Sequence, residues 1–135
     1  MKLLPHLAPN KTNYEIIPTR NIVFSFNASG FEVLEKYNET KNYCFDDLGV
    51  EPTGSHYAKD CNVIGEILLS RYDLFTKNGL GQSQSQGRSL TAKTHITTNL
   101  NAKELEKCYG NRLRSRMRTM LNLISFDENS VDKRK

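Results

Sequence analysis

Short β-favouring runs alternate with helical stretches along this 135-residue chain, and this alternation restricts its fold more than any other feature. Strands separated by helices form a parallel sheet with helices on its faces. The pattern predicts strands at 14–17, 43–46, 95–99 and near 122–126, and helices at 22–26 (ending near 27–30), 31–37, 57–75, 102–109 and 112–121. We therefore expect a single α/β domain over residues 1–135, with a charged tail at 127–135.

The helical patterns differ in clarity. The run Ile22–Phe26 suits a buried strand or a helix, and we favour a helix with Thr19 as its cap. Asn101 with Glu104 predicts the start of the helix 102–109. Side chains expected to face inward at three- and four-residue steps are Ile22, Val23 and Phe26, then Phe31, Leu34 and Tyr37, then Tyr57, Cys61, Ile64, Leu68, Tyr72 and Phe75.

Composition excludes several classes of protein. A hydrophobic content of 37% and a charged content of 25% are typical of a globular domain rather than a disordered or fibrous chain. No apolar stretch approaches the roughly 20 residues that span a bilayer, and Pro5 interrupts the opening run well before the length of a signal peptide. The net charge of +4 is compatible with a nucleic-acid partner without requiring one.

The chain contains three cysteines, which are Cys44, Cys61 and Cys108. They are odd in number and form no C-x-x-C pair, so neither a metal finger nor a disulfide framework is expected. This usage predicts a protein of the reducing cytoplasm.

The segment NYCFDDLG at 42–49 ends an apolar strand with two adjacent carboxylates, Asp46 and Asp47. One interpretation is a strand that runs into a turn, because Asp and Gly favour turns. The other is a metal site, because parallel sheets bind their ligands at the carboxyl ends of the strands. The predicted parallel sheet favours the metal site and leaves the turn open.

Three segments in order, YCFDDLG, HITTNL and ELEKCYGNRLRSRM, resemble the DnaC/IstB-type branch of the AAA+ ATPases. These are bacterial helicase loaders and transposition helper ATPases, and the resemblance runs from about Tyr14 to the end of the chain. It implies a P-loop NTPase fold, ATP and Mg²⁺ as ligands, and a homo-oligomer when the domain is complete. It also implies a replicative helicase or transposase as the partner, acting on single- or double-stranded DNA, and no membrane.

The resemblance implies roles at the ends of two strands. Asp46 would hold Mg²⁺ through its water shell, and Asp47 would polarise the attacking water. The sensor element would comprise Thr97, Thr98 and Asn99, with Thr98 near the nucleotide and Asn99 bonded to the γ-phosphate or the lytic water. Apart from the resemblance, Asn99 is equally suited to capping the next helix.

Four arginines lie between positions 112 and 118, and the helical period divides them into two pairs. Arg112 and Arg116 share one flank of an apolar stripe, while Arg114 and Arg118 share the other. The resemblance implies that the first pair reaches the nucleotide of a neighbouring subunit and the second faces solvent or DNA. The alternative is a solvated basic face. The resemblance also implies a nucleotide-sensing arginine late in the chain, and Arg134 in the tail is the candidate for it.

The printed sequence has no counterpart of the family's phosphate-binding loop, G-x-x-x-x-G-K-[ST]. The segment Gly81–Ser89 imitates it, but it has five residues between its glycines, Arg88 in place of lysine, and a strand after it. We therefore interpret 76–93 as a loop, and residues 1–8 as the end of the helix that follows the missing element.

The chain thus resembles the later part of an ATPase domain, as a truncated gene model, a fragment or a degenerate paralogue. The resemblance implies that the missing first strand lies centrally in the sheet, between the sensor strand and the last strand, so its absence would expose backbone groups on both sides of a gap. We expect that the sheet closes over this gap, that another chain fills it, or that the fold is poorly stable. The alternative function is a non-catalytic interaction or DNA-binding module that keeps the fold without turning over ATP.

Overall fold

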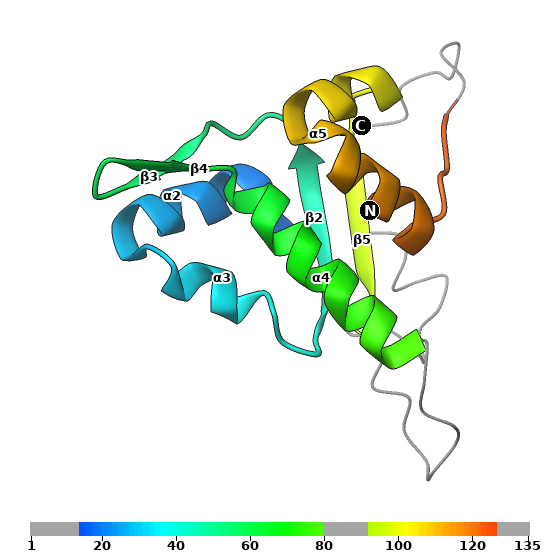
Figure 1. Ribbon diagram of the computed structural model, residues 1–135, viewed down its shortest axis with the longest axis horizontal. Coiled ribbons are helices and arrows are strands. Elements are labelled where there is room, and N and C mark those ends of the chain that lie inside the picture. Colours follow the sequence, from blue (N-terminus) through cyan, green and yellow to red (C-terminus); the bar gives the residue numbers. More distant parts are fainter. Residues whose placement is uncertain (1–13, 80–91, 127–135) are drawn as a thin grey trace, which may run out of the picture.

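The computed structural model describes residues 14–79 and 92–126, which form two small sheets and four helices (Figure 1). The strands of the main sheet are β1 (Tyr14–Pro18), β2 (Asn42–Leu48) and β5 (Thr94–Thr98). A hairpin comprises β3 (Gly54–His56) and β4 (Lys59–Cys61). The helices are α2 (Thr19–Ser29), α3 (Glu32–Lys36), α4 (Val63–Gly79) and α5 (Ala102–Met120). The α/β class and the alternation of strands with helices are confirmed.

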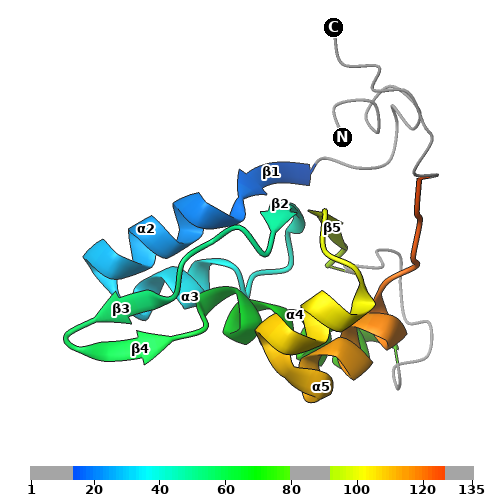
Figure 2. The ribbon, with the colours of Figure 1, turned by 90° about the horizontal axis from the view of Figure 1, so that it is seen from above.

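The main sheet is parallel, in the order β1-β2-β5. Figure 2 shows its strands side by side, with α4 and α5 on one face. Ile17, Phe45 and Ile96 occupy neighbouring register positions on that face and join the core with the helices. Because all three strands run the same way, their carboxyl ends meet at one edge, which we call the carboxyl edge.

Helix α2 buries Ile22, Val23 and Phe26, as the sequence predicts. Two expectations next to it are wrong. Thr19 is the first residue of the helix and not its cap, because Pro18 precedes it and the Thr19 hydroxyl is bonded elsewhere. Phe31 is 57% exposed, because α3 starts only after it and the ring rests edge-on against Phe26 at the surface.

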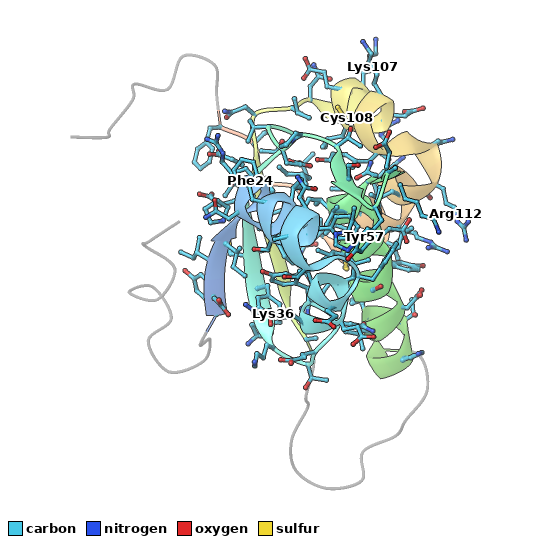
Figure 3. The ribbon with its side chains drawn as sticks, turned by 90° about the vertical axis from the view of Figure 1, so that its left-hand side faces the viewer. Phe24, Lys36, Tyr57, Lys107, Cys108 and Arg112 are labelled. Carbon is cyan, nitrogen blue, oxygen red and sulfur yellow. The ribbon has the colours of Figure 1, made fainter. Side chains whose placement is uncertain are left out.

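The long helix begins six residues later than predicted. Residues 54–61 form the hairpin instead, with Tyr57 and Ala58 as its two turn residues, both at positive φ (50° and 58°). Tyr57 is therefore 89% exposed at the hairpin tip rather than part of an apolar stripe, and it faces the viewer in Figure 3. Asn62 fixes the true start of α4, because its Oδ1 accepts a hydrogen bond from the Gly65 N–H at 2.9 Å.

Helix α5 joins the two helices that the sequence predicts. Asn101 accepts hydrogen bonds from the second and third backbone N–H groups, and Glu104 accepts one from the Asn101 N–H, which completes a capping box. Gly110 interrupts the helix with φ 82° and ψ 161°. The strand expected near 122–126 does not form: the chain is extended at Leu121, but no described strand pairs with it.

Arg71 lies inside the core of the molecule with 1% of its surface exposed. Its guanidinium stacks on Tyr43, 5.1 Å from the ring centroid, and Nε donates to Thr94 Oγ1 at 2.9 Å. Its two terminal nitrogens donate to the backbone carbonyls of Tyr37, Glu39, Lys41 and Lys93 at 2.9–3.3 Å. Burial lowers the pKa of Arg71, yet an arginine stays charged. One side chain thus ties α4 to the segment before β2 and to the start of β5.

Several expectations concern residues outside the described ranges. They are the resemblance of 1–8 to a helix end, the imitation loop Gly81–Ser89, and the tail 127–135 with Arg134. Within the described ranges, no helix combines the length and the apolar character needed to cross a membrane.

Candidate functional site at the carboxyl edge

The acidic pair lies at an irregularity in the sheet. Phe45 pairs with Ile96 and Leu48 with Thr98, so two residues of β2, Asp46 and Asp47, face one residue of β5. Such a bulge changes the direction of side chains and is frequent beside functional sites. Asp47 takes a positive φ of 58°, a conformation that Asp tolerates better than most residues. The bulge explains how two adjacent acids can both remain at the edge while Leu48 returns to the core.

Thr97 is the residue opposite the acidic pair, and its hydroxyl contacts both acids. It donates a hydrogen bond to Asp46 Oδ1 at 2.5 Å and accepts one from the Asp47 N–H at 2.9 Å. From the other side, the Thr19 hydroxyl lies 3.0 Å from the Asp47 carbonyl oxygen. The Asp46 carboxylate is half-buried and oriented, whereas Asp47 is exposed, with its backbone held by Thr97 of β5 and by Thr19 of α2.

The other two residues of the sensor element differ in what they contact. The Thr98 hydroxyl donates to the Leu48 carbonyl at 2.7 Å and accepts from the Leu100 N–H at 3.0 Å, so it closes the turn after β5. Asn99 is exposed just beyond the strand. The interpretation of Asn99 as a helix cap is wrong, because Asn101 caps α5.

Glu51 connects three elements behind the acidic pair. Its Oε2 accepts a hydrogen bond from the Gly49 N–H at 2.8 Å and lies 2.9 Å from the Thr19 hydroxyl. Its Oε1 accepts a hydrogen bond from the hydroxyl of Tyr109, in the first half of α5. Burial, followed by the bond to Glu51, raises the pKa of Tyr109, so this hydroxyl keeps its proton. We call Thr19, Glu51 and Tyr109 the Glu51 network.

Tyr109→Phe tests the Glu51 network. The variant leaves a half-buried carboxylate with one donor fewer, so we expect a loss of about 1–3 kcal/mol in the free energy of unfolding, measured by urea denaturation. Tyr57→Phe is the matched control, because its hydroxyl is at the exposed hairpin tip, and it should change stability by less than about 0.5 kcal/mol. Equal effects of the two variants would mean that the network contributes nothing to the fold.

The arginines follow the kink of α5. Arg112 is exposed, and Figure 3 shows it on the outside of α5, pointing away from the sheet. Arg116 is half-buried, with its guanidinium 5.1 Å above the Tyr72 ring. Arg114 forms an ion pair with Glu106 across the kink, and Arg118 is exposed. The resemblance assigns both Arg112 and Arg116 to a neighbour's nucleotide, but the two differ in the structure. Arg112 is accessible, whereas the guanidinium of Arg116 already contacts a ring of its own subunit.

The donor set at the carboxyl edge consists of oxygen atoms. Asp46 and Asp47 offer carboxylates and Thr97 a hydroxyl, the hard ligands that Mg²⁺ accepts together with water and substrate phosphates. In the described part of the chain, no three His, Cys, Asp or Glu side chains gather as a metal-holding group. Cys44 is buried beside Asp46, and burial raises the pKa of its thiol to about 11, so the thiol is protonated at neutral pH.

Comparisons with known proteins do not assign the chain to a family. No family model matches it, and no curated protein or solved structure is significantly similar to it. The arguments for function therefore rest on the sequence and on the geometry of the carboxyl edge.

Sequence reasoning located the acidic pair but missed part of its surroundings. The sequence predicts Thr97 as part of the sensor element but not its bonds to both aspartates, which depend on the register of β2 against β5. No sequence pattern indicates a role for Glu51. Its partner Tyr109 is 58 residues away, so no local pattern could have indicated the contact.

Proposed function

We propose that this chain is the later part of a DnaC/IstB-type AAA+ ATPase domain. With a phosphate-binding loop supplied, it would use ATP and Mg²⁺ to remodel a replicative helicase or a transposase on DNA, as a homo-oligomer. The substrate class is a nucleoside triphosphate, and the reaction is transfer of its γ-phosphoryl group to water.

The observation that carries this proposal is the contact between Asp46 and Thr97. It joins the acidic end of one strand to the polar end of its parallel neighbour, the arrangement that the resemblance requires of an acidic element and a sensor. The strand order supports the proposal as well. β5 pairs only with β2 among the described strands, and its other edge is where the missing first strand of the family would lie.

In the proposed reaction these side chains would position the metal ion and the attacking water and help to balance charge, because phosphoryl transfer needs little covalent chemistry from the protein. Asp46, oriented by Thr97, would hold the water shell of Mg²⁺. Asp47, with its backbone fixed by Thr19 and Thr97, would orient the attacking water. Bound Mg²⁺ would supply positive charge to the phosphates and would reduce the repulsion between the two acids.

The second candidate is a non-catalytic interaction or DNA-binding module. The printed sequence contains no G-x-x-x-x-G-K-[ST], the loop on which phosphate affinity in this class depends. The exposed basic residues of α5, among them Lys107 and Arg112, are compatible with a DNA contact (Figure 3). The two candidates differ in whether the carboxyl edge takes part in chemistry.

The test compares the 135-residue chain with a version extended upstream in its reading frame. We expect the 135-residue chain to bind a fluorescent ATP analogue with Mg²⁺ weakly or not at all. An extended version that contains a phosphate-binding loop should hydrolyse ATP, and Asp46→Asn should weaken its Mg²⁺-dependent binding and abolish turnover. Asp60→Asn, an exposed acid on β4, is the control and should change neither. A reading frame without such a loop would favour the second candidate.

Full activity of the Asp46→Asn variant would show that the acidic pair is only a turn. Micromolar binding by the 135-residue chain would reveal a phosphate site other than the one proposed.

A further inference from the structure

One edge of β5 and the segment 121–126 have no strand partner among the described residues, and each is suited to pair with the other. β5 pairs with β2 on one side, and no described strand pairs with its other side. An unpaired edge presents backbone N–H and C=O groups that can template another strand. Nothing in β5 itself discourages such pairing, because its sequence THITT contains no proline and no charged side chain other than a titratable His95.

The pairing pattern identifies the backbone groups that face the free edge. The Tyr43 N–H donates to the Lys93 carbonyl at 3.1 Å, and Tyr43 lies opposite Thr94 in the register. In a parallel ladder this directs the backbone groups of His95 and Thr97 toward β2. The alternate residues, Thr94 and Ile96, direct theirs to the free edge.

The segment 121–126, LNLISF, has the composition of a strand without a strand's partner. Leu123, Ile124 and Phe126 are 94%, 80% and 87% exposed. The segment contains no charge, proline or glycine, and its only backbone hydrogen bond among the described residues is from the Leu121 N–H to the end of α5. In Figures 1 and 2 it runs on the side of β5 away from β2, unpaired. Three large apolar side chains that are at least 80% exposed within four residues leave apolar area on this segment for another surface to cover.

We infer that two copies of this chain exchange these elements: the segment 121–126 of each copy adds as a strand to the free edge of β5 in the other. Reciprocal exchange uses the same two surfaces on both copies, so it closes as a two-fold dimer instead of propagating into a fibre. Strand addition supplies affinity through main-chain hydrogen bonds. The inference concerns the 135-residue chain and does not depend on the proposed ATPase activity; in an extended version, the family's first strand would occupy the same edge of β5 in place of the exchanged segment.

The area available is sufficient for a specific dimer. The aromatic side chain of Phe126 buries about 150–250 Å² when it is fully covered, and the aliphatic Leu123 and Ile124 bury less. Two copies contribute six large side chains from 121–126, and each also covers part of the facing strand and helix. The total reaches the order of 1,000 Å² that separates specific interfaces from incidental contacts.

The first measurement is the mass of the 135-residue chain by sedimentation velocity over a range of concentrations. We expect a dimer that returns to the single-chain mass in the variant Ile124→Lys, which puts a charge into the added strand. Val50→Lys is the matched control, because Val50 is also an exposed aliphatic residue, at 60%, and gains the same charge outside the exchanged elements. This control should stay dimeric. A wild-type chain that remains a monomer, or equal dissociation of both variants, would overturn the inference.

Amide hydrogen exchange distinguishes strand exchange from any other contact between copies. The His95 and Thr97 amides, bonded to β2, should be protected in the wild type and in Ile124→Lys alike. The Thr94 and Ile96 amides should be protected in the wild type and lose that protection in Ile124→Lys. Wild-type protection at Thr94 and Ile96 that persists in a monomer would show that another segment of the same chain fills the edge. Free exchange there in a dimer would place the dimer contact elsewhere. Either result contradicts the inference.

Discussion

Replacement of Arg71 by methionine will lower the free energy of unfolding by roughly 3–5 kcal/mol, because several buried or partly buried acceptors lose a hydrogen bond at once. Methionine fills much of the same space, so the loss reflects hydrogen bonding more than a cavity. The acceptors that lose their contact with Arg71 are the carbonyls of Tyr37, Glu39, Lys41 and Lys93 and the hydroxyl of Thr94, and of these the Lys93 carbonyl keeps the Tyr43 N–H as a donor. A domain with about 5–15 kcal/mol of stability would lose a large part of it.

Urea denaturation followed by circular dichroism measures this loss. Arg118→Met is the control, since Arg118 is exposed in the last turn of α5, and it should stay within about 0.5 kcal/mol of the wild type. The stability of Arg71→Lys should fall between those of the two variants, because lysine keeps the charge but offers three hydrogen-bond donors to the five acceptors that Arg71 contacts. If Arg71→Met were as stable as the control, the buried guanidinium would not be organising the segment before β2.

The second large effect concerns an arginine supplied to a neighbouring subunit. In a version extended to include a phosphate-binding loop, Arg112→Ala should lower the ATPase rate of the assembled protein by ~10³–10⁵ while leaving ATP affinity unchanged. Arg112 is chosen because it is exposed, whereas Arg116 rests on Tyr72 of its own subunit. We expect Arg116→Ala to reduce stability as well as activity, because it removes that stacking contact.

Mixed assemblies test whether the site is shared. An Arg112→Ala subunit mixed with an Asp47→Asn subunit should recover part of the ATPase rate, since each lacks a different half of the site. Asp47→Asn alone should bind ATP without hydrolysing it. Arg118→Ala should retain the rate and change at most the affinity for DNA, with a shallower salt dependence. The absence of recovery, together with equal losses from Arg112 and Arg118, would mean that the helix presents only a basic surface.

The parts of the fold that were predicted correctly depend on short-range patterns. The helix with Ile22, Val23 and Phe26 on one face and the capping box of Asn101 and Glu104 are visible within a few residues of sequence. The hairpin was missed because Tyr57 and Ala58 take positive φ without the Asn-Gly sequence that usually indicates such a turn. Tyr57 and Cys61 also continued the helical period by coincidence, which placed the start of α4 too early.

The remaining differences arise from contacts that are distant in sequence. The segment 122–126 has the residues of a strand, but a strand exists only where another strand pairs with it. At the carboxyl edge, the position of Asp46 and Asp47 could be predicted from strand direction. Their fixation by Thr97 could not, because it depends on a bulge that shifts the register by one residue.

Gly110 divides α5 into two halves that are held in place by different contacts. Its φ of 82° and ψ of 161° are open almost only to glycine, although a side chain there would meet nothing within 4 Å. The half before Gly110 is bonded to Glu51 through Tyr109, and the half after it packs into the core through Leu113 and Met117. The ion pair between Arg114 and Glu106 spans the kink and joins the two halves at the surface. The backbone conformation of this one glycine therefore sets the direction in which the arginine-bearing half of α5 leaves the half that is bonded to Glu51.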